Sequence, residues 1–177
     1  MVRPIRLAAM AALAILFATP LAAREVSDAM GTVTVPDLPE RIVVLTNEGT
    51  EALLALGVHP VGAVNSWQGD PWWDHIEAQM GDAEPVGTES AVNLELVAAL
   101  QPDLIIGNRQ RQEDIYPQLS AIAPTVMSSE LRGDWKVNFE LYAEALGLSD
   151  KGEEVIAEYD ARVADLREKL GDATNEE

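Results

Sequence analysis

Hydrophobic residues in the middle of the chain come in short continuous runs, each followed by a polar segment and a helical pattern. Residues 42–45 (Ile-Val-Val-Leu) form one run and residues 104–107 (Leu-Ile-Ile-Gly) form another. Continuous rather than alternating apolar positions are typical of strands covered on both faces in a parallel sheet. Between the runs, residues 51–56 carry leucines at helical spacing, and Gly57 ends that pattern. The sequence therefore predicts an α/β fold with a parallel sheet.

The same analysis assigns elements to most of the remaining chain. Residues 24–30 show no period and are expected to be a mobile lead-in, whereas residues 31–35 alternate and predict an edge strand. Pro71, capped by Asp70, and Asn93 are expected to start helices. Short strands are expected over residues 60–64, 85–87 and 124–127, and helices over residues 71–80, 94–100, around 115–122 and 135–146.

The final helical pattern is longer than the others. One face of it carries Val155, Ile156, Tyr159, Val163, Leu166 and Leu170. Asp150 and Glu153 fit a capping box at its start, so we expect a helix over residues 149–170, followed by a polar tail over 171–177. A long helix at the edge of a small sheet is suited to connecting two bodies.

The first 23 residues differ in composition from the rest. Arg3 and Arg6 precede an apolar run over residues 7–18, and small residues follow. This arrangement predicts a signal peptide over residues 1–23. The apolar run is shorter than the ~20 residues that a membrane-spanning helix needs.

Charge and cysteine content narrow the functional classes. The chain has 30 acidic and 12 basic residues, which argues against nucleic acid and anionic membranes as partners. It has no cysteine, which excludes disulfides and an acylated N-terminal cysteine. We therefore expect a soluble protein of the bacterial periplasm.

No constellation of catalytic or metal-ligating residues is found in the sequence. His59 and His75 are isolated, without a second ligand at zinc spacing. There is no nucleophile elbow and no phosphate loop. We therefore expect neither an enzyme, nor a bound metal, nor a cofactor.

Two polar or aromatic segments follow predicted strands, where open α/β sheets bind ligands. Trp67, Trp72 and Trp73 follow one strand and fit either an aromatic wall of a ligand cleft or core packing. Arg109 and Arg111 follow another, and they can bind an anionic ligand. Local balance by the acidic residues at 113 and 114 is the alternative for the arginines.

An ordered series of short motifs resembles the periplasmic iron-siderophore binding proteins of ABC importers. Within that family, the resemblance is greatest to the ferric-citrate and related ferric-siderophore receptors. The series is Gly-Thr-Val-Thr-Val-Pro (31–36), Pro-Glu-Arg-Ile-Val-Val (39–44), Glu-Ala-Leu-Leu-Ala-Leu-Gly-Val (51–58), Pro-Val-Gly (60–62), Val-Gly (86–87), Asn-Leu-Glu (93–95), Pro-Asp-Leu-Ile-Ile (102–106) and Tyr-Pro-Gln-Leu-Ser-Ala-Ile-Ala-Pro-Thr (116–125). The resemblance covers nearly all of the chain after the signal peptide.

This resemblance implies a class III periplasmic binding protein, with two α/β lobes joined by a long rigid helix and a chelate held between them. Residues 24–148 would be the N-terminal lobe and residues 149–170 the interlobe helix, with the second lobe absent from this sequence. Because cleft closure needs both lobes, this chain alone is expected to bind weakly or not at all.

The resemblance also implies site residues. Carried over by position, the ligand-binding residues would be Thr46, Asn47, Glu48, Trp67, Thr88, Glu89, Arg109 and Arg111. Glu95 would dock against arginines of the membrane permease, although a first-turn acid that stabilises a helix is the alternative. Many family members carry an arginine in the loop after Val-Gly, where this chain has Thr-Glu-Ser. That departure shifts the anion-binding role toward Arg109 and Arg111.

The expected function is that of a periplasmic substrate-binding component of an ABC importer for a ferric siderophore or ferric citrate. The partners would be the chelate and an inner-membrane permease. A cobalamin, haem or metal receptor of the same fold is one alternative. A periplasmic adaptor domain without a small ligand is another.

Overall fold

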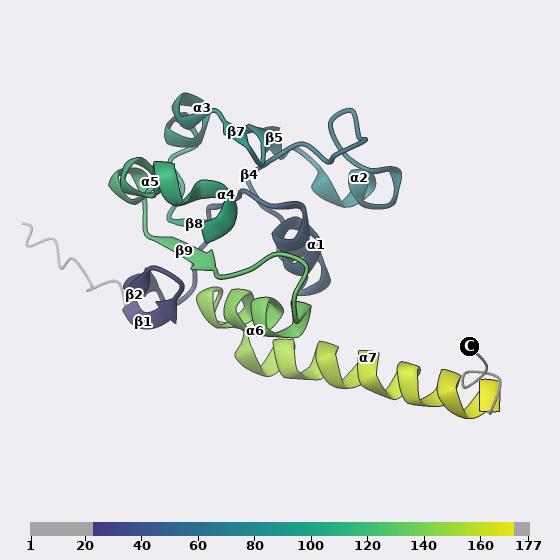
Figure 1. The fold of residues 1–177 in the computed structure, drawn as a ribbon. Helices are drawn as coiled ribbons and strands as arrows, with labels where there is room; N and C mark the ends of the chain where they lie inside the picture. The colour runs from purple at the N-terminus through teal and green to yellow at the C-terminus, as the bar shows by residue number, and fades with distance from the viewer. Residues whose placement is uncertain (1–22, 172–177) are drawn as a thin grey trace, which may run out of the picture.

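A five-stranded parallel sheet forms the centre of the protein (Figure 1). The computed structural model describes residues 23–171, so the predicted signal peptide and polar tail lie almost wholly outside the described residues. The strand order is β5 (Glu84–Pro85), β4 (Gly62–Ala63), β3 (Ile42–Val44), β8 (Leu104–Asn108) and β9 (Thr125–Ser128). The parallel α/β prediction is thus confirmed.

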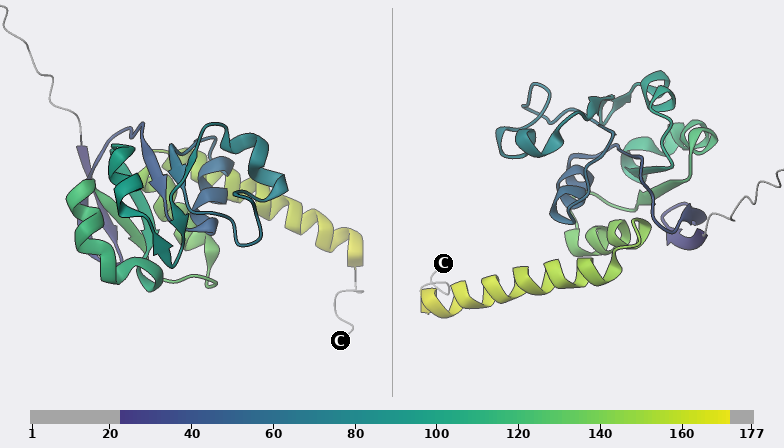
Figure 2. Two further views of the ribbon diagram at one scale, coloured as in Figure 1. Left: turned by 90° about the horizontal axis from the view of Figure 1, so that it is seen from above. Right: turned by 180° about the vertical axis from the view of Figure 1, so that it is seen from behind.

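Helices cover both faces of the sheet, as Figures 1 and 2 show. On β3, Ile42 and Val44 belong to one apolar cluster, which includes residues of α1 (Asn47–Ala55) and α6 (Trp135–Ala145). Val43 belongs to the opposite cluster, with residues of α3 (Leu94–Ala99) and α5 (Tyr116–Ile122). Since both faces of β3 are buried, its sequence is continuously apolar.

The N-terminal segment is a β-hairpin rather than a mobile lead-in, so that prediction was wrong. Strands β1 (Ala23–Asp28) and β2 (Gly31–Pro36) pair antiparallel, and Val26 is fully buried. The Arg24 guanidinium donates hydrogen bonds to the carbonyls of Glu144 and Ala145, both at 2.6 Å, at the end of α6. The segment lacks a clear hydrophobic pattern, and distant contacts such as these hold it in place.

Several helices begin at positions other than those predicted. Helix α1 starts at Asn47 because the Thr46 hydroxyl accepts a hydrogen bond from the backbone N–H of Gly49 at 3.0 Å. Helix α2 (Asp74–Met80) starts after Trp73, not at Pro71. The predicted loop after β8 is instead α4 (Arg109–Gln112), capped by the Asn108 side chain, and a 3₁₀ turn (Glu113–Ile115).

The long C-terminal helix α7 (Ser149–Leu170) is confirmed, but the capping box is not. Asp150 and Glu153 lie inside the helix, and no side chain caps its first turn. Near its start, Gly152 packs against α6: a Cβ atom at this position would lie 2.6 Å from the Ala143 Cβ. Only a glycine allows the two helices to approach this closely.

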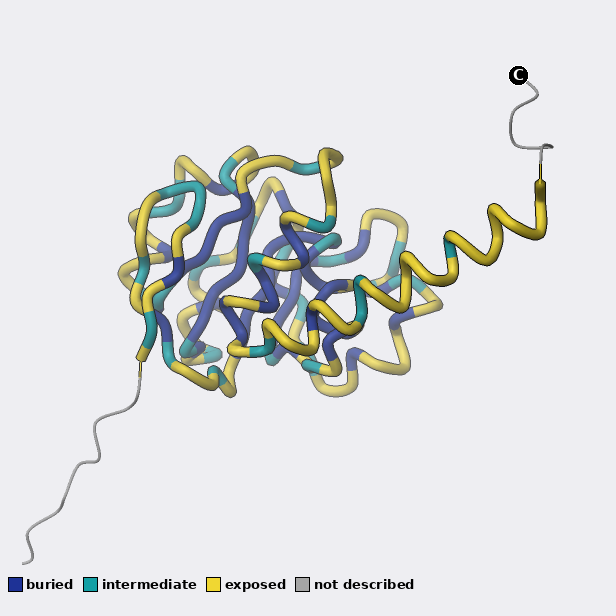
Figure 3. Tube along the Cα trace, turned by 90° about the horizontal axis from the view of Figure 1, so that it is seen from below, coloured by how far each residue is buried: buried dark blue, intermediate teal, exposed yellow. Residues whose placement is uncertain are grey.

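Beyond its contacts with α6, which reach Tyr159 and Asp160, α7 extends away from the sheet and is exposed over most of its surface (Figures 1 and 3). Leu166 and Leu170 on its apolar stripe are 56% and 57% exposed. The interlobe role of α7 stays a prediction. Within residues 23–171, no helix combines the length and apolar character needed to cross a membrane.

Candidate functional site

The segments that follow the parallel strands line two adjoining cavities at the carboxyl-terminal ends of the strands. Their volumes are about 220 Å³ and 310 Å³. Trp67, Glu89 and Arg111 line both cavities, so we treat them as one strand-end cleft. The cleft is completed by Asn47, Glu48, Asn65, Ser66, Trp73, Thr88, Ser90, Leu131 and Arg132.

Glu89 and Arg111 form an ion pair between the two cavities. Glu89 lies on the turn between β6 (Gly87–Thr88) and β7 (Ala91–Val92), and its side chain is only 9% exposed. Its Oε1 accepts hydrogen bonds from the backbone N–H of Asn47 at 2.8 Å and from the Asn47 side-chain amide at 3.0 Å. Its Oε2 lies 3.4 Å from Nε of Arg111. The positive end of α1 thus meets a carboxylate of the protein itself.

Glu48, in the first turn of α1, is held by two side chains of α6. The Asn138 amide donates to Glu48 Oε1 at 2.7 Å, and the Tyr142 hydroxyl donates to the same atom at 3.4 Å. Burial raises the pKa of Glu48, the hydrogen bonds from Asn138 and Tyr142 lower it less, and the nearby charge of Glu89 adds to the increase. The folded protein therefore keeps the proton on this carboxyl to a higher pH than an exposed glutamate would.

A buried glutamine connects the strand ends beneath the cleft. The Gln112 amide nitrogen donates to the carbonyl of Glu89 at 2.8 Å and to that of Leu45 at 3.2 Å. Its carbonyl oxygen accepts from the backbone N–H of Asn108 at 2.8 Å. Gln112 is fully buried, so these bonds fix the loops that carry Glu89 and Arg111 relative to each other.

The tryptophan segment divides between core and cleft. Trp72 is 7% exposed and packs in the core, whereas Trp67 is 62% exposed in the cleft. The Arg132 guanidinium lies 5.5 Å from the centroid of the Trp67 ring, a cation–π contact worth about 0.5–1 kcal/mol at an exposed site. Trp73 lines the cleft and stacks on His75, with ring centroids 5.6 Å apart.

Six of the predicted ligand-binding residues line the cleft, and two do not. Those in the cleft are Asn47, Glu48, Trp67, Thr88, Glu89 and Arg111. Thr46 is fully buried as the cap of α1. Arg109 lies 3.5 Å from the carbonyl of Ala29 in the β1–β2 turn. Neither arginine pairs with Glu113 or Asp114 in the part of the chain that the structure describes.

Sequence reasoning missed Leu131, Arg132, Gln112 and Asn138. Arg132 follows β9 in a loop that no pattern marks, and the Asn138 amide holds this loop through the carbonyl of Glu130 at 2.7 Å. Asn138 and Tyr142 stand one helical turn apart among the buried residues of α6. This polar pair on an otherwise buried helix face is the sequence signal that could have identified Asn138.

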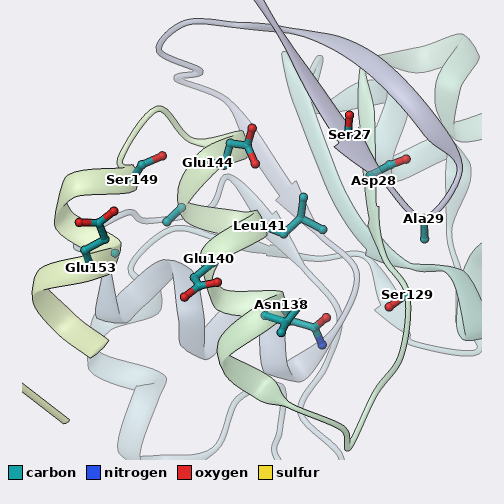
Figure 4. A pocket seen from close by; sticks show the side chains of 13 residues that line it. Ser27, Asp28, Ala29, Ser129, Asn138, Glu140, Leu141, Glu144, Ser149 and Glu153 are labelled. Atoms are coloured by element: carbon teal, nitrogen blue, oxygen red, sulfur yellow. The ribbon is translucent and has the colours of Figure 1, made fainter. Parts of the chain in front are cut away.

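A larger groove of about 710 Å³ lies elsewhere, between the β1–β2 turn, α6 and the start of α7 (Figure 4). Acidic side chains surround it, including Glu140, Glu144 and Glu153 (Figure 4). The described residues contain no group of three or more His, Cys, Asp or Glu side chains placed to hold a metal ion.

The two histidines are exposed but not isolated. His75 Nε2 lies 2.8 Å from Glu51 Oε1, and His59 Nδ1 lies 2.7 Å from the carbonyl of Gln79.

The structure is thus a parallel α/β lobe with a cleft at the strand ends, followed by a long helix. The chain belongs to the periplasmic binding protein family, whose profile matches residues 42–177. The probable siderophore-binding lipoprotein YfiY of Bacillus subtilis (strain 168) is 60% identical over 153 residues, which cover 86% of this chain and 47% of that protein. The Fe(3+) dicitrate-binding periplasmic protein FecB of Escherichia coli (strain K12) is 36% identical over 124 residues, covering 70% of this chain and 39% of that protein.

A solved structure shows the same arrangement. Staphylococcus aureus SirA complexed with staphyloferrin B superimposes with a TM-score of 0.78 and 39% identity, over 85% of this chain and 52% of that chain. The chain thus spans about half the length of the relatives that it matches.

Proposed function

We propose that this chain is the chelate-binding part of a substrate-binding component of an ABC importer, which takes up a ferric siderophore or ferric citrate. The observation that carries the proposal is the cleft itself, where Arg111 and Arg132 line the same cavity as the exposed Trp67 ring and Arg132 lies over that ring. The guanidinium groups would neutralise anionic oxygens of the chelate, and the indole would cover its apolar edge. The names of YfiY, FecB and SirA support this class of ligand.

The chelate would be bound as a whole, with the iron held by the siderophore or citrate as cargo. The protein would perform no chemical step on it, so its role is binding and delivery. Glu95, exposed in the first turn of α3, would dock against the permease. The protein would act in the periplasm, and N-terminal sequencing of the exported form should then begin near Arg24.

Tryptophan fluorescence tests the ligand class. The mature chain, residues 24–177, is titrated with ferric citrate and with ferric catecholates and hydroxamates. Because the matched relatives are about twice as long, the same titrations are run on a chimera that carries the second half of YfiY. We expect saturable quenching by one chelate class, weak in this chain alone and strong in the chimera.

Variants assign the quenching to the cleft. Changing Trp67 to Phe should remove most of the signal, and R132A should weaken binding about ten-fold, as expected for a lost charge-assisted contact. Arg162→Ala, an exposed arginine on α7, serves as the charge-matched control. Absence of quenching in both proteins would rule out the chelate and favour an adaptor domain.

A further inference from the structure

Both carboxylate oxygens of Glu89 are already engaged within the protein. Oε1 accepts two hydrogen bonds from Asn47, and Oε2 faces Nε of Arg111 at 3.4 Å. The side chain is 9% exposed although it lies in the wall of both cavities. A chelate could therefore reach Glu89 only by displacing the Asn47 hydrogen bonds on Oε1 or the Arg111 ion pair on Oε2.

Arg111 differs from Glu89 in what it leaves free. Its side chain is 36% exposed, and Glu89 is its only ion-pair partner among the residues described. The pair engages Nε, so the two terminal nitrogens of this cleft-lining guanidinium are left as possible donors to a ligand. A guanidinium held in this way loses less side-chain entropy when it binds an anionic oxygen.

The support for Glu89 is rigid. Gln112 holds its backbone carbonyl at 2.8 Å, and the N–H of Asn47 belongs to the first turn of α1. The start of α1 after β3, the helix α4 after β8 and the β6–β7 turn therefore converge on one carboxylate. Such supporting contacts are what hold a binding group in its productive geometry.

We propose that Glu89 is a positioning residue that orients Arg111 for an anionic oxygen of the chelate, rather than a ligand contact. This inference rests on the proposed function. The cleft then has two arginines of different kinds. Arg111 is paired with an internal carboxylate, whereas Arg132 has no ion-pair partner within residues 23–171 and lies over the Trp67 ring.

The first test needs no chelate. NMR relaxation of the Arg111 Nε–H bond is compared in wild-type protein and E89Q. Glutamine keeps the oxygen that accepts from Asn47, so the start of α1 is preserved while the charge facing Arg111 is removed. We expect an ordered bond in wild type and an order parameter below about 0.6 in E89Q. Equal values in the two proteins would overturn the proposal.

The second test is a double-mutant cycle in the YfiY chimera with the chelate that quenches Trp67. We expect E89Q to weaken binding about ten-fold in the wild-type background and to have no further effect in R111A. Independent losses that multiply would show direct contact of Glu89 with the chelate, and tighter binding by E89Q would show that Glu89 repels it. Either result would overturn the proposal.

Glu140→Gln, at an exposed position of α6, is the control, and we expect it to leave the chelate affinity unchanged. If wild-type protein binds none of the chelates, the proposed function fails. The relaxation measurement still decides whether Glu89 holds Arg111.

Discussion

At the scale of single residues, the Glu48 carboxyl is half-buried at the edge of the cleft, where burial raises its pKa. An acid whose pKa is raised by folding stabilises the native state at low pH. That contribution is lost as the pH rises through the raised value, because the folded protein must then hold a partly buried charge. Neutral pH is therefore the costly condition for Glu48.

The change Glu48→Gln removes this cost, since a neutral amide can still accept the hydrogen bond from Asn138. We expect E48Q and wild type to melt at similar temperatures near about pH 4, and E48Q to be the more stable near about pH 7. Thermal melts across this range provide the measurement. A difference between the two proteins that does not vary with pH would show that Glu48 ionises as freely as an exposed glutamate.

Individual site residues could be predicted from the sequence only where they directly follow a recognisable buried strand. Arg111 was found in this way, because it follows the buried run of β8. Arg109 stands two residues earlier on a helical turn, so its side chain points roughly 200° away and reaches the β1–β2 turn instead. Arg132 carries no local signal, because the bond from Asn138 to the Glu130 carbonyl places its loop.

At the scale of elements, the buried strands and the longer helices could be predicted because their patterns reflect burial on a fixed face. The β1–β2 hairpin could not. Its order comes from Val26 in the core and from the hydrogen bonds of Arg24 to the end of α6, more than a hundred residues away in sequence. Helix starts were missed where a cap such as Thr46 or Asn108 stood inside a polar segment.

The contact of α6 with α7 gives a prediction at this scale. In G152A the new Cβ would meet that of Ala143, and the expected cost of about 1–3 kcal/mol exceeds the gain of roughly 1 kcal/mol in helix propensity. Urea denaturation should therefore show a destabilised protein. In A143G/G152A the clash is removed, and we expect a favourable coupling energy in the double-mutant cycle. If the stability effects of the two substitutions simply add, the helices can move apart without a cost in free energy.

At the scale of the whole molecule, the proposed docking of Glu95 separates delivery from binding. The charge reversal E95K should lower iron uptake by cells at least about ten-fold through repulsion of permease arginines, with chelate affinity unchanged. Glu140→Lys on α6 is the matched surface control. If Glu95 only stabilises the first turn of α3, uptake will stay normal and the stability will fall by a few tenths of a kcal/mol.

The exposed reach of α7 has a mechanical consequence. Its 22 residues span roughly 33 Å at the rise of an α-helix, and its contacts with α6 run from Gly152 to Asp160, so that only the later part of the helix projects beyond them. The helix is therefore a lever arm that turns with its packing on α6, which is closest at Gly152. A rotation of about 5° about Gly152, which lies roughly 27 Å from Leu170 along the helix, would move the far end by roughly 2.4 Å, so a small adjustment between two helices is enlarged at the far end of α7.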